Sequence, residues 1–267
     1  MIRSMMVAAF GSMVLMTACA PVKIGVSDSL RQAHDEYKVA GRQGVLIRQK
    51  LSFGEFNTTV VSRSWTKGGG SKFGIGQMGA TAEDFQNLIS LEYIKRKQTV
   101  QFDLGDGRQS ASTYCVTQFN AKDLELGRHT NSVLNIGMDL LKLGGWSKHT
   151  YYVQIYTPTA ARPWEMLIDN QAVDARSKTY TGLLSLSKDQ YYSIVPVTTV
   201  EKKNGNTGSA WAVLGFEFRD SAGKAVAAVS LVDNGMVIMG KVGAEERLLL
   251  ANACAALLLQ QDISEKV

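Results

Sequence analysis

A long apolar segment close to the C-terminus sets the strongest limit on how this chain can fold. Its sequence, AEERLLLANACAALLLQQD, covers Ala244–Asp262 and predicts a helix about 28 Å long. Between Leu248 and Leu259 the one polar residue is Asn252. A helix that is apolar on every face must be surrounded on every face, either by lipid or by protein.

Protein, and not lipid, is the expected surrounding of this helix. Residues 248–259 are too few to span a bilayer, which takes roughly 20 apolar residues. The chain before the helix reads as strands, and strands enclose a helix by closing into a barrel. We therefore expect a mainly β fold: a closed antiparallel β-barrel of about 10–12 strands enclosing the C-terminal helix. Burying the leucines of the helix contributes on the order of 10 kcal/mol.

Alternation of apolar and polar residues supports the barrel. Val100, Phe102 and Leu104 share one face and precede the turn sequence Gly105–Gly107. Near the end of the chain, strands are expected over 211–219, 225–232 and 236–239, with turns at 220–223 and 233–235. The terminal segment aside, helices are expected only over 81–91 and, after a cap at Ser27-Asp28, through Tyr37.

The order of these elements resembles a known superfamily. A hairpin, a short strand and a hydrophobic helix over Phe216–Ile263 are similar to the tubby C-terminal superfamily, which includes the phospholipid scramblases and the plant LURP-one-related proteins. The similarity in architecture covers Gly41–Ile263 and implies an antiparallel barrel around a C-terminal helix. Tubby proteins bind phosphoinositides through basic residues of the barrel wall. No matching motif occurs in this sequence, so the resemblance assigns no site residue.

The first residues have the features of an export signal. One arginine precedes the apolar run Met5–Met16, and MTAC at Met16–Cys19 resembles a bacterial lipobox, with Met16 where leucine is usual. We expect residues 1–18 to be a lipoprotein signal peptide and Cys19 to be acylated as the lipid anchor. Residues 19–40 are then a tether and residues 41–267 the barrel domain. Ala20 after the cysteine favours the outer membrane, facing the periplasm.

Charge limits the classes of partner. Removal of residues 1–18 takes away one arginine and leaves 28 basic and 24 acidic residues, a net charge of +4. This mild, scattered excess argues against nucleic acid and is compatible with an anionic membrane surface. The densest basic cluster, Lys95, Arg96 and Lys97, is the candidate contact with lipid headgroups or a partner, and a charged, solvated hairpin edge is the alternative interpretation.

Other motifs favour structural interpretations. Gly74–Gly79 matches G-x-G-x-x-G but follows a glycine-rich stretch and not a buried strand, which favours a surface loop over a dinucleotide site. The three histidines are far apart, and the aspartates at 103, 106 and 233 lie in or beside expected turns, so no cofactor or metal is predicted.

Cys115 and Cys254 are expected as buried free thiols, with one disulfide as the alternative. The aromatic residues over 146–164 are expected mainly in the core, with an outward-facing half available for a partner or sugar as the alternative.

These expectations combine into a functional hypothesis. The sequence suggests a cell-envelope lipoprotein, attached to the membrane through its acyl chains, that serves as a non-catalytic binding or structural module. Its expected contacts are lipid headgroups or an envelope protein. Two alternatives are an envelope hydrolase acting on lipid or glycan, and a lipocalin-like carrier of an apolar ligand. A helix inside the barrel argues against the carrier because it occupies the cavity such a protein needs.

The lipid anchor gives a first testable prediction. Cells fed a clickable fatty acid should label the wild-type protein and should not label the Cys19→Ala variant, because the variant has no thiol at the lipobox position. In-gel fluorescence of the purified proteins measures the difference. Equal labelling of the two would remove the anchor from the account.

Overall fold

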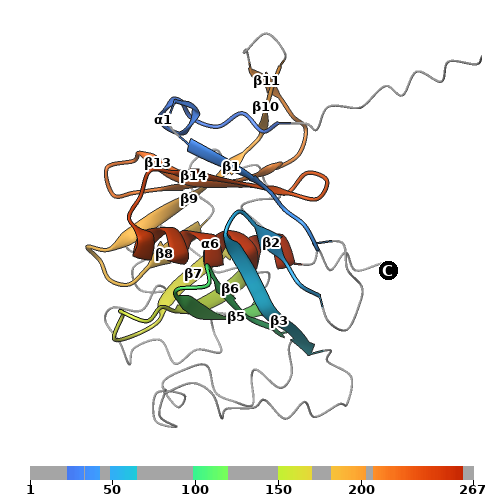
Figure 1. Ribbon diagram of the computed structural model, residues 1–267. Helices are drawn as coiled ribbons and strands as arrows, with labels where there is room; N and C mark the ends of the chain where they lie inside the picture. The colour runs from blue at the N-terminus through green and yellow to red at the C-terminus, as the bar shows by residue number, and fades with distance from the viewer. Residues whose placement is uncertain are drawn as a thin grey trace, which may run out of the picture.

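The computed structural model describes residues 23–32, 34–42, 49–64, 99–119, 150–169, 182–202 and 207–260 (Figure 1). The strands of its large sheet are β1 (His34–Lys38), β2 (Ser52–Phe53), β3 (Phe56–Ser64), β4 (Thr99–Gly105), β5 (Ser110–Phe119), β6 (Thr150–Tyr156), β7 (Trp164–Asp169), β8 (Gly182–Ser185), β9 (Tyr191–Val197), β12 (Gly215–Arg219), β13 (Ala225–Ser230) and β14 (Met236–Gly240). The remaining elements are the strand pair β10 (Thr199–Glu201) and β11 (Thr207–Ser209) and the helices α1 (Asp28–Arg31) and α6 (Ala244–Leu259).

The large sheet has twelve strands and curves into a nearly closed antiparallel barrel. The strand order is β1-β14-β13-β12-β9-β8-β7-β6-β5-β4-β3-β2, so β1 and β2 are its two ends. Backbone hydrogen bonds draw these ends together just beyond β1, where Ala40 N donates to Ser52 O at 2.9 Å and Ser52 N donates to Ala40 O at 3.0 Å. The mainly β, antiparallel barrel expected from the sequence is confirmed.

Helix α6 runs through the middle of this barrel (Figure 1). Each residue over 248–259 is at most 2% exposed, and the helix packs against β4, β5, β6, β13 and β14. Large inward-facing side chains such as Phe102, Tyr151 and Phe218 belong to the same core. The prediction that strands surround the apolar helix is therefore confirmed. The helix ends at Leu259, short of the predicted Asp262.

The one polar residue within the apolar part of α6 has partners for its amide. Asn252 accepts a hydrogen bond from Thr113 Oγ1 at 2.9 Å and donates to Leu248 O at 2.9 Å and Leu104 O at 3.4 Å. A buried amide without partners would destabilise the fold, whereas these bonds fix the helix to β4 and β5 at one axial position.

The structure of the segment expected to be a tether, residues 19–40, differs from that expectation. Its described part packs on the barrel: Ile24, Val26 and Leu30 are buried, and β1 pairs with β14 from His34↔Gly240 to Lys38↔Met236. The expected helix through Tyr37 was wrong, because α1 ends at Arg31 and residues 34–38 are a strand. Pairing with the edge of β14 satisfies backbone groups that would otherwise be left open there.

Other expectations fall outside the described residues. The helix expected over 81–91 and the surface loop expected over Gly74–Gly79 lie in ranges that the structure does not describe.

Shortening one inward leucine of α6 tests the packing. Leu250 has no exposed surface, so Leu250→Ala should lower the free energy of unfolding by about 2–5 kcal/mol through lost burial and a residual cavity. Urea denaturation followed by circular dichroism measures it. The exposed Lys241→Ala is the matched control and should change stability by no more than about 0.5 kcal/mol. Equal stability of the two variants would contradict the packing described.

Candidate functional site

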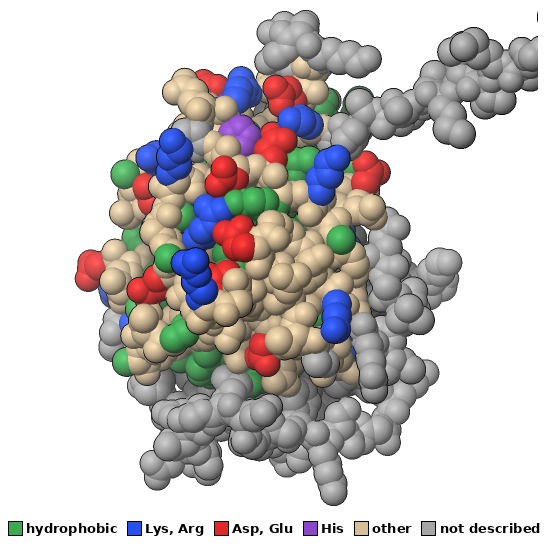
Figure 2. Space-filling view, in the orientation of Figure 1, with side chains coloured by type: hydrophobic (Ala, Val, Ile, Leu, Met, Phe, Trp, Pro, Cys, Tyr) green, Lys and Arg blue, Asp and Glu red, His purple; other side chains and the backbone are tan. Residues whose placement is uncertain are grey.

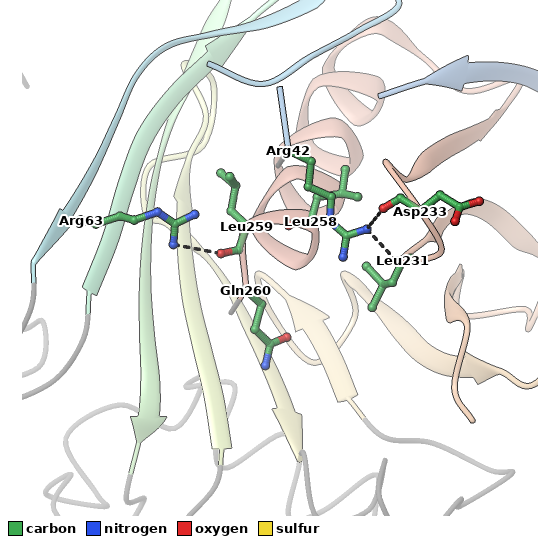
Figure 3. Close-up of a pocket in the computed structure, with 7 residues that line it drawn as sticks. All are labelled: Arg42, Arg63, Leu231, Asp233, Leu258, Leu259 and Gln260. Carbon is green, nitrogen blue, oxygen red and sulfur yellow. Dashed lines mark hydrogen bonds between the residues drawn. The ribbon is translucent and has the colours of Figure 1, made fainter. Parts of the chain in front are cut away.

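A pocket of about 270 Å³ opens at the C-terminal end of α6 (Figure 3). Two arginines from the barrel, Arg42 and Arg63, lie on opposite sides of the end of the helix. The pocket is lined by Arg42, Arg63, Leu231, Asp233, Leu258, Leu259 and Gln260. Because it combines two guanidinium groups with a hollow, it is the candidate binding site among the described residues.

Arg42 joins the end of the helix to the turn after β13. Its Nε donates to the carbonyl oxygen of Leu258 at 3.2 Å, and its Nη1 donates to the carbonyl oxygens of Leu231 at 2.6 Å and Asp233 at 3.1 Å. Figure 3 shows the side chain pointing between the helix and this turn. One side chain thus fixes the position of two segments that are distant in the sequence.

Arg63 approaches the same helix end from β3. Its Nη1 donates to the carbonyl oxygen of Leu259 at 3.3 Å, and its Nη2 donates to Gln49 Oε1 at 2.9 Å. The buried Gln49 in turn donates through Nε2 to the carbonyl oxygens of Arg42 at 2.6 Å and Gly41 at 3.1 Å. The two arginines therefore belong to one connected hydrogen-bond network. Burial lowers the pKa of Arg63, but a guanidinium keeps its charge at neutral pH.

The last four carbonyl groups of a helix have no partner within it, and here each of the four has one. Tyr151 Oη donates to the carbonyl of Ala256 at 2.8 Å, and the amide of Gln260 donates to Ala256 and Leu257. Arg42 and Arg63 satisfy Leu258 and Leu259. Two positive groups at this end also complement the negative pole of the helix. The main role of the arginines in this structure is consequently to cap α6.

The N-terminal end of α6 is held by a second set of polar contacts. Glu246 accepts a hydrogen bond from Tyr192 Oη at 3.0 Å, and Glu245 accepts one from Thr159. Arg247 forms ion pairs with Glu55 at 2.7 Å and Asp35 at 3.3 Å. Burial, followed by the charge of Glu246, raises the pKa of Tyr192, so its hydroxyl remains a donor at neutral pH. Both ends of the helix are thus attached to the barrel rim.

The described thiols are not suited to nucleophilic chemistry. Cys115 and Cys254 are fully buried and free, as the first interpretation of the sequence expected. Burial raises the pKa of Cys115 to about 12 and raises that of Cys254 as well, so both remain protonated at neutral pH. Of the three histidines, His34 lies in the described part of the chain, where its Nε2 is 3.1 Å from Glu36 Oε1.

The aspartates that could suggest calcium serve turns or strand contacts. Asp106 Oδ1 accepts hydrogen bonds from the amides of Arg108 at 2.8 Å and Gln109 at 2.9 Å, which lowers its pKa. Asp103 accepts one from Ser112 Oγ, and Asp233 occupies a turn with φ of 51°. Over the described ranges no cluster of three or more His, Cys, Asp or Glu residues could hold a metal ion.

Several residues singled out from the sequence lie outside the described ranges. Among them are Cys19, the basic cluster Lys95, Arg96 and Lys97, and Trp146. Of the aromatic residues that are described, Tyr151 and Tyr152 are buried, and Trp164 packs on Tyr192 with ring centroids 5.8 Å apart. The interpretation of this group as core holds for these residues.

Sequence reasoning did not identify the arginine pair. Val61 and Arg63 lie two residues apart in β3 and therefore share a face, and Val61 is buried in the core. A charged residue on the inward face of a barrel strand is a signal that a partner lies inside. Arg42 gives no comparable signal, because the carbonyl groups of Leu258, Leu231 and Asp233 that its guanidinium contacts lie 216, 189 and 191 positions away in the sequence.

Comparison of the chain with models of known protein families, with curated proteins and with solved structures gives no match. Among the residues that the structure describes, no helix is long and apolar enough to cross a membrane.

Removal of Arg42 tests its capping role. Arg42→Met keeps most of the aliphatic stem but leaves the carbonyls of Leu258, Leu231 and Asp233 without this donor, so stability should fall by about 1–3 kcal/mol. Thermal and urea unfolding measure the change, with the exposed Lys50→Met as the matched control. If the two variants were equally stable, the guanidinium would be available for a ligand and the capping assignment would fail.

Proposed function

We propose that the protein is a cell-envelope lipoprotein whose barrel domain is a non-catalytic binding or structural module. In this proposal acylated Cys19 holds the domain at the outer membrane, facing the periplasm. The barrel then contacts lipid headgroups or an envelope protein through its outer surface, with Lys95, Arg96 and Lys97 as candidate contacts.

The observation that carries this proposal is the filled barrel. A carrier of an apolar ligand needs a cavity among its strands, but the described interior is occupied by residues 248–259 and the side chains packed around them. A partner would then have to bind to the outer surface or the rim of the barrel. This argues for an interaction module and against the lipocalin-like alternative.

The chemistry of the pocket at the C-terminal end of α6 also supports binding over catalysis. Its two guanidinium groups are permanent cations and do not exchange protons at neutral pH. They already cap the helix through Leu258 and Leu259. An envelope hydrolase would need a nucleophile or general base directed into such a pocket. The one carboxylate of its lining, that of Asp233, points away from the two arginines (Figure 3).

We further propose kinship with the tubby C-terminal superfamily. The support is the shared arrangement of a twelve-stranded antiparallel barrel around a hydrophobic C-terminal helix. This kinship concerns the fold. The phosphoinositide binding of tubby proteins is not extended to this chain.

Envelope fractionation and site-specific crosslinking test the proposal together. Wild-type protein should be recovered in the outer-membrane fraction, whereas recovery in the soluble periplasmic fraction would contradict the proposed anchor. In the anchored protein, a photoreactive residue in place of Lys97 should capture a lipid or one defined envelope protein. The same residue in place of Lys188, on the exposed turn after β8, is the control and should capture much less. Equal capture at both positions, or capture at neither, would contradict the assignment of the basic cluster.

A further inference from the structure

The first described segment is fastened to the outside of the barrel, and residues 23–32 are called the N-terminal strap below. Ile24, Val26 and Leu30 of the strap are buried and share a small core with Ala228 of β13 and Ile238 of β14. This core is separate from the one that contains α6. The strap therefore lies on the side of the sheet away from the helix, as Figure 1 shows for α1.

Hydrogen bonds place the beginning of the strap along β10. Gly25 N donates to Thr199 O at 2.7 Å, Thr199 Oγ1 donates to Gly25 O at 2.9 Å, and Glu201 N donates to Lys23 O at 2.8 Å. Ile24 forms a bridge with Val200. The strap thus adds to β10 on the side opposite β11, and Lys23 lies beside Glu201.

A buried carboxylate holds the middle of the strap. Glu217 of β12, which is 3% exposed, accepts a hydrogen bond from Ser27 N at 2.5 Å. Its other oxygen accepts from Arg219 Nη2 at 2.8 Å, so the carboxylate is paired as well as hydrogen-bonded. This contact holds the strap on the sheet, because releasing Ser27 N would lose a hydrogen bond to a charged group.

The length of chain before the strap limits how far the barrel can lie from the lipid anchor. Cys19 and Lys23 are four positions apart in the sequence, and even a fully extended chain spans at most about 14 Å over that separation. Because Lys23 is fixed to β10, an acyl chain on Cys19 brings the β10–β11 sheet to the membrane surface.

An exposed tryptophan lies on this same part of the molecule. Trp211 is 86% exposed and lies in the loop between β11 and β12. Ala210 N donates to Thr198 O at 2.7 Å and Leu214 N donates to Val197 O at 2.8 Å, so both ends of this loop are fixed beside the start of β10. Tryptophan is enriched at membrane–water interfaces, where its apolar ring and polar N–H suit the headgroup region.

The charge of this surface does not by itself distinguish it as a membrane-binding surface. Lys23 pairs with Glu36 at 2.8 Å, and the exposed Lys202 adjoins the exposed Glu201. On the face shown in Figure 2, basic and acidic side chains are interspersed. An attraction to the membrane by net positive charge would therefore be weak here, and the indole ring supplies the distinguishing chemistry.

We propose that the surface formed by the N-terminal strap, β10 and β11 faces the bilayer and that Trp211 inserts into its interface. This inference rests on the proposed lipid anchor at Cys19 and adds the orientation of the barrel. The pocket at the C-terminal end of α6 belongs to a different part of the barrel and is not needed for this contact.

Tryptophan quenching by brominated lipids tests the orientation. Acylated protein purified from membranes is reconstituted into vesicles of phosphatidylethanolamine and phosphatidylglycerol with brominated acyl chains. The wild-type protein contains four tryptophans. Trp211→Phe should remove about half or more of the quenching if this ring is the interfacial one. Trp164→Phe is the matched control, because Trp164 packs on Tyr192, and it should leave the quenching unchanged.

Quenching that is the same in wild type and Trp211→Phe would overturn the inference and leave the proposed function in place. Absence of fatty acid on wild-type Cys19 would overturn the proposed function instead. In that case the orientation is still testable on the mature chain, by coupling Cys19 to a maleimide lipid while Cys115 and Cys254 remain buried and unreactive. A Trp211→Phe protein coupled in this way and quenched like wild type would again refute the membrane-facing surface.

Discussion

A helix without a polar face is stable in water only when other parts of the chain cover it on every side, and this requirement explains most of the structure. Residues 248–259 are covered by a sheet that nearly closes upon itself. The small residues of the helix allow the walls to come close, and leucines fill the remaining space. Helix and barrel are therefore mutually dependent: α6 lies in the main hydrophobic core of the strands, and the strands cover the helix.

The enclosure also demands that the polar ends of the helix find partners. At the C-terminal end, Tyr151, Arg42, Arg63 and the amide of Gln260 satisfy the last four carbonyl groups. At the N-terminal end, Glu246 and Arg247 join the helix to several strands. The pocket between the arginines follows from this capping arrangement. The binding role that we propose is accordingly assigned to the outer surface, where the N-terminal strap and Trp211 lie.

How far the sequence could predict this structure depends on the range of the interactions. Apolar composition at 248–259 and strand alternation such as that of Val100, Phe102 and Leu104 are local, and they were enough to predict the barrel and its helix. The pairing of His34 with Gly240 joins residues 206 positions apart, so the strand at 34–38 was mistaken for tether and helix. The arginine caps depend on tertiary contacts in the same way. Of the two arginines, only Arg63 could have been recognised from the sequence, because it lies on the inward face of β3.

Amide hydrogen exchange is the most direct measurement of the central claim that strands enclose α6. If they do, the amides of residues 248–259 can exchange only when the barrel opens, and their protection should equal that of β13, one of the strands packed against the helix. If the amides of residues 248–259 exchanged much faster than those of β13, the helix would be opening to solvent on its own. That result would contradict the enclosure, and with it the argument for an outer binding surface.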